Sequence, residues 1–255
     1  MTHPIRVLHV DDDPGLAELV ASFLERYNDR FDVHSETSPD DGLATLATND
    51  IDCVVSDYDM PGKTGLDFLK DIRENHLTHP FILYTGKGSE EIASRAMSNG
   101  VTDYIQKERC TDHYEVLANA IENAVSQYRT EQRAATMERR YKALFNQSEA
   151  AIAWIAFEGE TPIIQDVNPA FNTMFCGADE AVVGDDLDEV VVTDEQSAEA
   201  RALSQKIRTG QSVVGVFTRE TVDGSRRMQV QVIPVPAPDD QPIMNAFAIY
   251  FKVDQ

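Results

Sequence analysis

Short apolar runs alternate with amphipathic stretches through the first half of the chain. The amphipathic stretches carry apolar side chains every three to four residues, which predicts helices with one buried face. The first of them contains Leu16, Leu19, Val20, Phe23 and Leu24. The apolar runs are short enough to be buried strands, and they lie at residues 5–10, 31–34, 53–56, 81–84 and 104–106. This alternation predicts a doubly wound α/β domain with a five-stranded parallel sheet and helices on both faces.

A charged helical stretch follows the last of these units. Between Ser126 and Ser148 there is no Gly or Pro, so one continuous helix is expected. Its apolar positions follow a heptad that changes phase partway. Two interpretations stay open, namely a helix that pairs with its copy in a homodimer and a single solvated linker. We expect a first domain at residues 1–127, a helical linker at 128–147 and a second domain at 148–255.

The second half of the chain carries the pattern of a small antiparallel sheet. Two strands are expected at residues 151–157 and 163–167, and three more at residues 212–221, 226–235 and 242–253. Between the two groups lie a short helix after Pro169 and a longer helix that ends at Gly210. This order predicts an α+β domain. Its core is expected to contain the large aromatic side chains Trp154, Phe157, Phe171 and Phe175.

Charge narrows the classes of partner. The chain has 44 acidic and 22 basic residues, which gives a formal charge of -22. Such a surface repels nucleic acid and anionic lipid, so neither is expected as a direct partner. The composition resembles that of proteins from extreme halophiles. No apolar run is long enough to span a membrane and the first residues do not resemble a secretory signal, so we expect a cytoplasmic protein. The three cysteines, Cys53, Cys110 and Cys176, are too widely spaced for a zinc motif.

Chemically distinctive side chains follow the strands of the first domain. Asp11 and Asp12 follow the first strand, Asp57 follows the third, and Thr85 and Lys107 follow the fourth and fifth. Because the carboxyl ends of parallel strands share one edge of a sheet, these side chains are expected to converge. Each like-charged pair at 4 Å costs about 4 kcal/mol at an effective dielectric of 20, so a cation such as Mg²⁺ is expected beside them. The arrangement suits phosphoryl transfer, with Asp57 as the nucleophile and Lys107 and Thr85 assisting it.

Four motifs around these residues resemble those of the receiver domain of two-component response regulators. They are VDDDP, VVSDYDMPGKTG, YTGKG and DYIQK, and the resemblance covers residues 5 to about 128. It implies a flavodoxin-like sheet of order 2-1-3-4-5 and phosphorylation of Asp57 by a histidine kinase. It also implies a Mg²⁺ ion held by Asp11, Asp12, Asp57 and the backbone carbonyl of Asp59.

The same resemblance implies a switch. Thr85 would move toward the phosphoryl group while Tyr104 turns inward, and Lys107 would contact the phosphoryl oxygens. The sequence departs from the family at Glu108, where a proline is usual, so a cis peptide bond is not expected there.

The second domain resembles a PAS domain over residues 141–253. The resemblance rests on VNPAFNTMFCG and on the terminal three strands. PAS domains are sensory and dimerising modules, and some bind haem or flavin. All six histidines precede residue 114, which excludes a haem held by a histidine of this domain, and a flavin-type cysteine motif is absent. A small apolar ligand or no ligand both stay open for this domain, and we favour no bound cofactor.

These observations favour a response regulator that accepts a phosphoryl group and relays it by protein contacts to an unknown downstream protein. Apart from its own phosphorylation and dephosphorylation, it is not expected to be an enzyme. One alternative is a PAS-based ligand sensor that uses the receiver as a docking module. Another, a haloacid-type phosphohydrolase, is disfavoured because its DxDx(T/V) motif would fall where this chain reads DDDPG.

Overall fold

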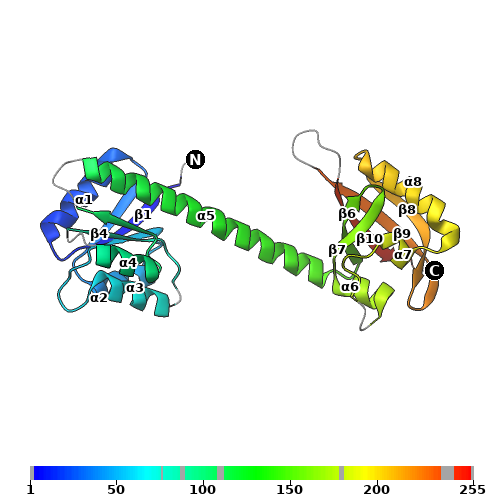
Figure 1. The fold of residues 1–255 in the computed structure, drawn as a ribbon, viewed down its shortest axis with the longest axis horizontal. Helices are drawn as coiled ribbons and strands as arrows, with labels where there is room; N and C mark the ends of the chain where they lie inside the picture. The colour runs from blue at the N-terminus through cyan, green and yellow to red at the C-terminus, as the bar shows by residue number, and fades with distance from the viewer. Residues whose placement is uncertain are drawn as a thin grey trace. The chain divides into compact units, whose positions relative to one another are not determined.

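The computed structural model describes residues 3–75, 77–86, 90–107, 112–177, 181–236 and 244–253 (Figure 1). The chain divides into two compact units, Met1–Ala135 and Thr136–Gln255. Helix α5 (Asp112–Gln147) contributes residues to both of them. Within the described ranges, no helix has the length and apolar character needed to cross a membrane.

Unit 1 is built on a parallel sheet of five strands in the order β2-β1-β3-β4-β5, which confirms the expected topology. The strands are β1 (Ile5–Val10), β2 (Phe31–Glu36), β3 (Cys53–Ser56), β4 (Phe81–Thr85) and β5 (Asp103–Gln106). The helices that precede α5 are α1 (Pro14–Tyr27), α2 (Pro39–Thr48), α3 (Gly65–Glu74) and α4 (Glu90–Ser98).

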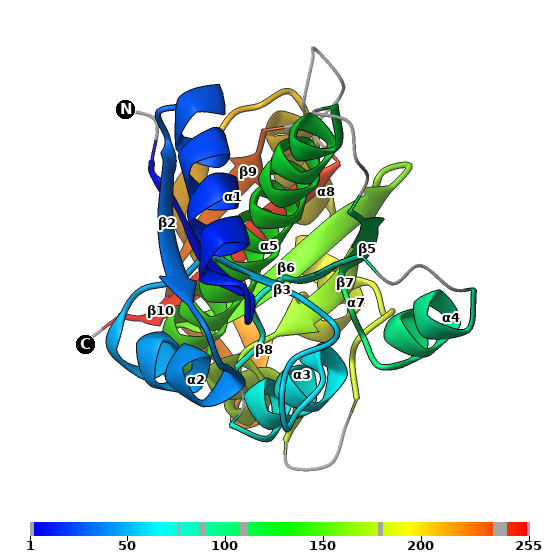
Figure 2. The same ribbon diagram turned by 90° about the vertical axis from the view of Figure 1, so that its left-hand side faces the viewer.

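Helices cover both faces of this sheet (Figure 2). Helices α1 and α5 pack on one face through buried residues such as Leu24 and Ile121. Helices α2, α3 and α4 pack on the other through residues such as Leu46 and Phe68. Strands buried on both faces need apolar side chains at every position, which is why they read as continuous apolar runs. Leu19, which the sequence placed on the buried face of α1, is 52% exposed.

Polar caps fix where the helices of unit 1 begin. The Asp13 side chain accepts hydrogen bonds from the backbone N–H groups of Gly15 and Leu16 and starts α1. Thr64 starts α3 in a capping box. Gly65, the first residue of α3, is required because a Cβ atom there would overlap the backbone oxygen of Asp57. Ser89, the expected cap of α4, lies outside the described residues.

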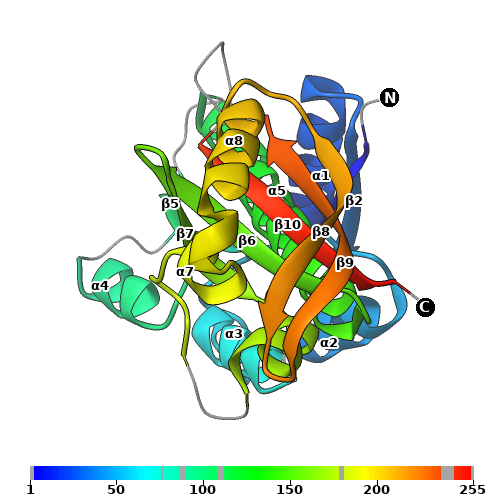
Figure 3. The same ribbon diagram turned by 90° about the vertical axis from the view of Figure 1, so that its right-hand side faces the viewer.

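Unit 2 contains an antiparallel sheet of five strands in the order β7-β6-β10-β9-β8 (Figure 3). The strands are β6 (Ala151–Glu158), β7 (Thr161–Val167), β8 (Val213–Thr221), β9 (Gly224–Val235) and β10 (Asn245–Lys252). The helical segments are α6 (Pro169–Phe171), the π-helical η1 (Asn172–Cys176), α7 (Leu187–Val191), the 3₁₀ turn η2 (Asp194–Gln196) and α8 (Ser197–Arg208). The short helix α7 was not expected, because its few residues lie in an acidic stretch with no clear period.

One face of this second sheet is buried beneath the helices, and the buried set includes Phe157, Phe171 and Phe175 as expected. The expectation that Trp154 fills the core is wrong. Burial alternates along β6, and Trp154 lies on the opposite face, where it is 36% exposed and stacks on Phe247 with ring centroids 6.4 Å apart. A strand places successive side chains on opposite faces, so Trp154 and Phe157 cannot share one face.

A buried asparagine joins the end of α5 to the second sheet. Asn168 is fully buried, and its Oδ1 accepts from the backbone N–H groups of Ile152 and Phe171, both at 2.9 Å. Its Nδ2 donates to the carbonyl oxygens of Phe145 at 3.1 Å and Ala150 at 2.8 Å. All the hydrogen-bonding capacity of the amide is therefore used to hold α5, β6 and α6 together.

Replacing Asn168 by Ala is expected to lower the free energy of unfolding of unit 2 by about 2–4 kcal/mol, because buried carbonyl and N–H groups lose their partners. Urea unfolding followed by the fluorescence of Trp154, the chain's one tryptophan, measures this unit. Asn172→Ala is the control, since its buried side-chain oxygen has no partner among the described residues. Equal losses in the two variants would contradict the role given to Asn168.

Candidate functional site

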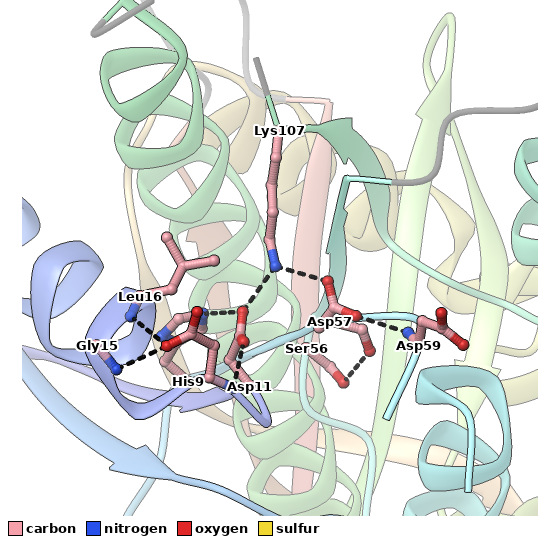
Figure 4. A network of polar contacts seen from close by, with 9 residues as sticks. His9, Asp11, Gly15, Leu16, Ser56, Asp57, Asp59 and Lys107 are labelled. Carbon is pink, nitrogen blue, oxygen red and sulfur yellow. Dashed lines mark hydrogen bonds and ion pairs between the residues drawn. The ribbon is translucent and has the colours of Figure 1, made fainter. Parts of the chain in front are cut away.

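The candidate site lies where strands of the parallel sheet of unit 1 end (Figure 4). Asp11 directly follows β1, Asp57 follows β3 and Lys107 follows β5. The backbone N–H of Asp57 donates to the carbonyl oxygen of Val10 at 2.8 Å, so the strand ladder continues to the residue that carries the carboxylate. The sheet therefore brings the three side chains to one edge, as the strand order predicts.

Lys107 lies between the two carboxylates. Its Nζ is 2.6 Å from Asp11 Oδ2 and 2.6 Å from Asp57 Oδ1. Asp11 is 2% exposed and Asp57 is 7% exposed, so little water screens these contacts. Charge-assisted hydrogen bonds of this length and burial are among the stronger polar interactions in a protein. The ammonium group thus holds the ends of β1, β3 and β5 together.

The turns after the strands orient the remaining carboxylate oxygens. Asp11 Oδ1 accepts from the backbone N–H of Asp13 at 3.0 Å. Asp57 Oδ2 accepts from the backbone N–H of Asp59 at 2.6 Å. Each carboxylate therefore has one oxygen on Lys107 and the other on its own turn, which leaves little freedom in its orientation.

Two further side chains border the site, and the sequence analysis did not single them out. His9 is fully buried, with Nε2 3.9 Å from Asp11 Oδ2, and burial lowers its pKa to about 4 although Asp11 opposes the shift. The ring centroid of Tyr84 is 5.3 Å from Lys107 Nζ, and burial raises the pKa of its hydroxyl. The alternation of side chains along a strand could have indicated His9, because it places His9 on the same side of the sheet as Asp11.

The charges at the site do not balance. His9 is neutral at pH 7 because of its lowered pKa, so among the described residues Lys107 is the cation that opposes Asp11 and Asp57. The neighbouring side chain of Asp12 is exposed and adds a further negative charge. Within the described ranges, no three His, Cys, Asp or Glu side chains are grouped as a ready metal site. The acidic pocket formed by Asp11 and Asp57 has the oxygen donors and the excess negative charge that suit a hard cation such as Mg²⁺.

The other residues that the sequence associated with the site lie around this pocket. The Asp59 side chain is exposed, and it is the backbone of this residue that faces Asp57. Thr85 is buried at the end of β4, and its carbonyl oxygen accepts from the N–H of Lys107 at 2.8 Å. Tyr104 in β5 is half-buried and packs against the core beneath α2, α3 and α4. Glu108 lies outside the described residues.

Two protein families match separate parts of the chain. Residues 7–120 match the response regulator receiver domain. Residues 139–208 match the PAS domain.

Curated relatives are response regulators and transcriptional regulators. Regulatory protein VanR of Enterococcus faecium is 32% identical over 102 residues, which are 40% of this chain and 43% of the relative. The methanogenesis regulatory protein FilR1 of Methanothrix harundinacea is 34% identical over 132 residues, 51% of this chain and 29% of the relative. The matched stretches span less than half the length of either relative.

Solved receiver domains are similar over about half of the chain. A response regulator receiver domain protein from Clostridium thermocellum is 28% identical with a TM-score of 0.44, covering 49% of this chain and 98% of that one. Response regulator TrrA of Thermotoga maritima, solved in complex with Mg²⁺-BeF, is 24% identical with a TM-score of 0.41, covering 46% and 98%. Together with the sheet order and the acidic pocket, the family matches identify residues 7–120 as a response regulator receiver domain and residues 139–208 as a PAS domain.

Proposed function

We propose that the chain is a phosphorelay response regulator in which Asp57 accepts a phosphoryl group from a histidine kinase. A receiver domain is a phosphoacceptor, and it implies a cognate kinase. The observation that carries the assignment to Asp57 is the buried contact of Lys107 with Asp57 and Asp11 at the edge of the sheet. Asp57 is the carboxylate at the centre of this edge, because β3 is the middle strand.

The transfer requires a nucleophile and charge neutralisation. An Asp57 oxygen attacks the phosphorus of phosphohistidine and an O–P bond forms as the P–N bond breaks. The leaving imidazole nitrogen keeps the electron pair of that bond and takes up a proton from water. Bound Mg²⁺ would neutralise charge on the phosphoryl oxygens, held by Asp11, Asp12, Asp57 and the carbonyl oxygen of Asp59. The Asp59 N–H keeps one Asp57 oxygen in place while the other reacts.

Lys107 has a different role before and after transfer. In the unphosphorylated site its ammonium group bridges the two buried carboxylates and offsets one of their two negative charges. After transfer, the same group is within reach of the new phosphoryl oxygens, which carry up to about two negative charges. The Thr85 hydroxyl would donate to one of these oxygens, and Tyr104 would repack as Thr85 moves. These two residues form the proposed switch.

Output is proposed to pass through protein contacts. A receiver at residues 1–127, a helical linker at 128–147 and a PAS domain at 148–255 would act on an unknown downstream protein, either as single chains or as homodimers joined through the linker or the PAS domain. The continuity of α5 across Asp112–Gln147 supports such a relay, because a helix transmits displacement along its axis. We propose that this exchange takes place in the cytoplasm.

Incubation with Mg²⁺ and a small phosphodonor such as acetyl phosphate is expected to label the protein. Asp57→Asn should abolish the label, since it removes the nucleophilic carboxylate. Asp13→Asn is the matched control, because Asn also caps a helix and Asp13 only starts α1. Intact-protein mass spectrometry reads the added phosphoryl group. A label that persists in Asp57→Asn would contradict the proposal.

Lys107→Met is expected to make the stability of unit 1 depend on Mg²⁺. Without the ammonium group the two buried carboxylates repel each other, which should cost about 3–4 kcal/mol until a cation binds. Hydrogen exchange of β1 and β3 amides, with and without Mg²⁺, measures the effect.

Lys63→Met is the control for this experiment. Lys63 also joins two carboxylates, Asp40 at 2.8 Å and Asp71 at 2.9 Å, but its side chain is 41% exposed. Replacement of Lys63 should leave the Mg²⁺ dependence of the stability of unit 1 as it is in the unchanged protein. The same Mg²⁺ response in the Lys107 and Lys63 variants would contradict the proposed ion site.

A further inference from the structure

The ring of Tyr84 lies next to the ammonium group of the receiver site. Tyr84 is the fourth residue of β4 and is fully buried. Lys107 Nζ lies over its ring, 5.3 Å from the centroid. This distance is within the roughly 6 Å over which the face of an aromatic ring attracts a cation. The site therefore contains a third group that attracts Lys107, besides its two carboxylates.

The ammonium group of Lys107 has one N–H donor more than the carboxylates use. Of its three donors, two are directed to Asp11 and Asp57, each with an oxygen 2.6 Å from Nζ. Within the described ranges the third has no hydrogen-bond acceptor. The ring face of Tyr84 carries the negative part of the aromatic quadrupole and offers this donor an electrostatic partner. The ring and the carboxylates together surround a lysine side chain that is only 15% exposed.

The hydroxyl of Tyr84 does not explain why the residue stands at this position. Its oxygen is buried and has no hydrogen-bond partner in the part of the chain that the structure describes. A buried hydroxyl without a partner costs stability relative to a phenylalanine ring of the same shape. The ring is therefore the part of the side chain that makes a favourable contact at the site.

Aromatic side chains of α5 and α1 hold the Tyr84 ring in place. It stacks on His113, with ring centroids 6.0 Å apart and planes inclined by 23°. The centroids of His113 and Tyr114 are 3.9 Å apart, and Tyr114 packs on Phe23 of α1 at 4.7 Å. A packed row of rings thus lies behind Tyr84, which leaves it little freedom to move away from Lys107.

We propose that Tyr84 is a positioning residue for phosphoryl transfer to Asp57, and that it acts through Lys107. Its ring attracts the ammonium group and restricts it to the place between Asp11 and Asp57. A long lysine side chain has many rotamers, and confining it beforehand removes an entropic cost from the transfer step. Such a role rests on the proposed function, because Lys107 assists the transfer only if Asp57 accepts the phosphoryl group.

A residue that only fills the core would behave differently on substitution. Leucine in place of Tyr84 would keep an apolar side chain in the core, but it would present no negative ring face to Lys107. Phenylalanine would keep the ring and remove only the hydroxyl. The comparison of these two substitutions therefore separates positioning of the ammonium group from packing of the core.

The first experiment measures the initial rate at which acetyl phosphate and Mg²⁺ label the full chain, by intact-protein mass spectrometry. We expect Tyr84→Phe to label as fast as the unchanged protein and Tyr84→Leu to label about three- to tenfold more slowly, as loss of a cation–π contact would cause. Phe81→Leu is the matched control and should keep the rate, because Phe81 is a fully buried ring of β4 in the core on the other face of the sheet. Circular dichroism verifies that each variant is folded.

A spectroscopic measurement on the unphosphorylated protein keeps the proposal testable if Tyr84→Leu does not fold. Protons over the face of an aromatic ring are shifted upfield in NMR spectra. The ε-methylene protons of Lys107 should therefore resonate upfield of those of Lys63, and Tyr84→Phe should keep the shift. Lys63 is the matched reference, because it also joins two carboxylates and has no aromatic ring over its ammonium group among the described residues. Loss of the signal in Lys107→Met assigns it.

Three results would overturn the proposal. Equal rates in Tyr84→Phe and Tyr84→Leu would show that the ring has no separate effect. An equal loss in Phe81→Leu would assign the effect to packing, and a Lys107 signal at the Lys63 position would remove the ring contact itself. Absence of label in the unchanged protein would instead contradict the proposed function, while the NMR comparison would still measure the contact of Tyr84 with Lys107.

Discussion

The contact of one buried ammonium group with two buried carboxylates is the interaction on which the receiver site depends. Asp11, Asp57 and Lys107 come from three strands, and Lys107 joins them with two contacts of 2.6 Å. The parallel sheet makes this contact possible, because the pairing of its strands places the backbones of all three residues at one edge of the sheet. The remaining excess of negative charge suits a metal ion, and a bound metal ion would in turn offset the charge of a phosphoryl group.

The second unit is subject to a comparable constraint, which is that each buried polar group needs a hydrogen-bond partner. Asn168 meets it fully, with four hydrogen bonds that fasten the end of α5 to β6 and α6. Arg219 does not meet it, since its buried Nε has no partner in the described part of the chain. The contrast separates Asn168, whose partners are all in the protein, from Arg219, whose guanidinium has an ion pair with Glu199 but whose buried Nε has no hydrogen-bond partner among the described residues.

Much of the fold could be predicted from periodicity, and the gaps have physical causes. The strand ends that carry Asp11, Asp57 and Lys107 were predictable because buried strands are apolar and end abruptly. The position of Lys107 between the carboxylates was not, because a long flexible side chain has many rotamers and the sequence does not select one. His9 and Arg219 were overlooked although the strand period places both facing inward. Trp154 was wrongly assigned to the core because a large aromatic side chain was assumed to be buried. The alternation of side chains along β6, which places it on the other face, was not considered.

We propose that phosphoryl transfer ends on the carboxylate of Asp57. The most direct measurement is to phosphorylate the full chain, reduce it with borohydride, which converts an aspartyl phosphate to homoserine, and locate the change by peptide mass spectrometry. We expect the change at position 57, in the peptide that joins β3 to α3. Conversion at Asp11, Asp12 or Asp59 instead would contradict it.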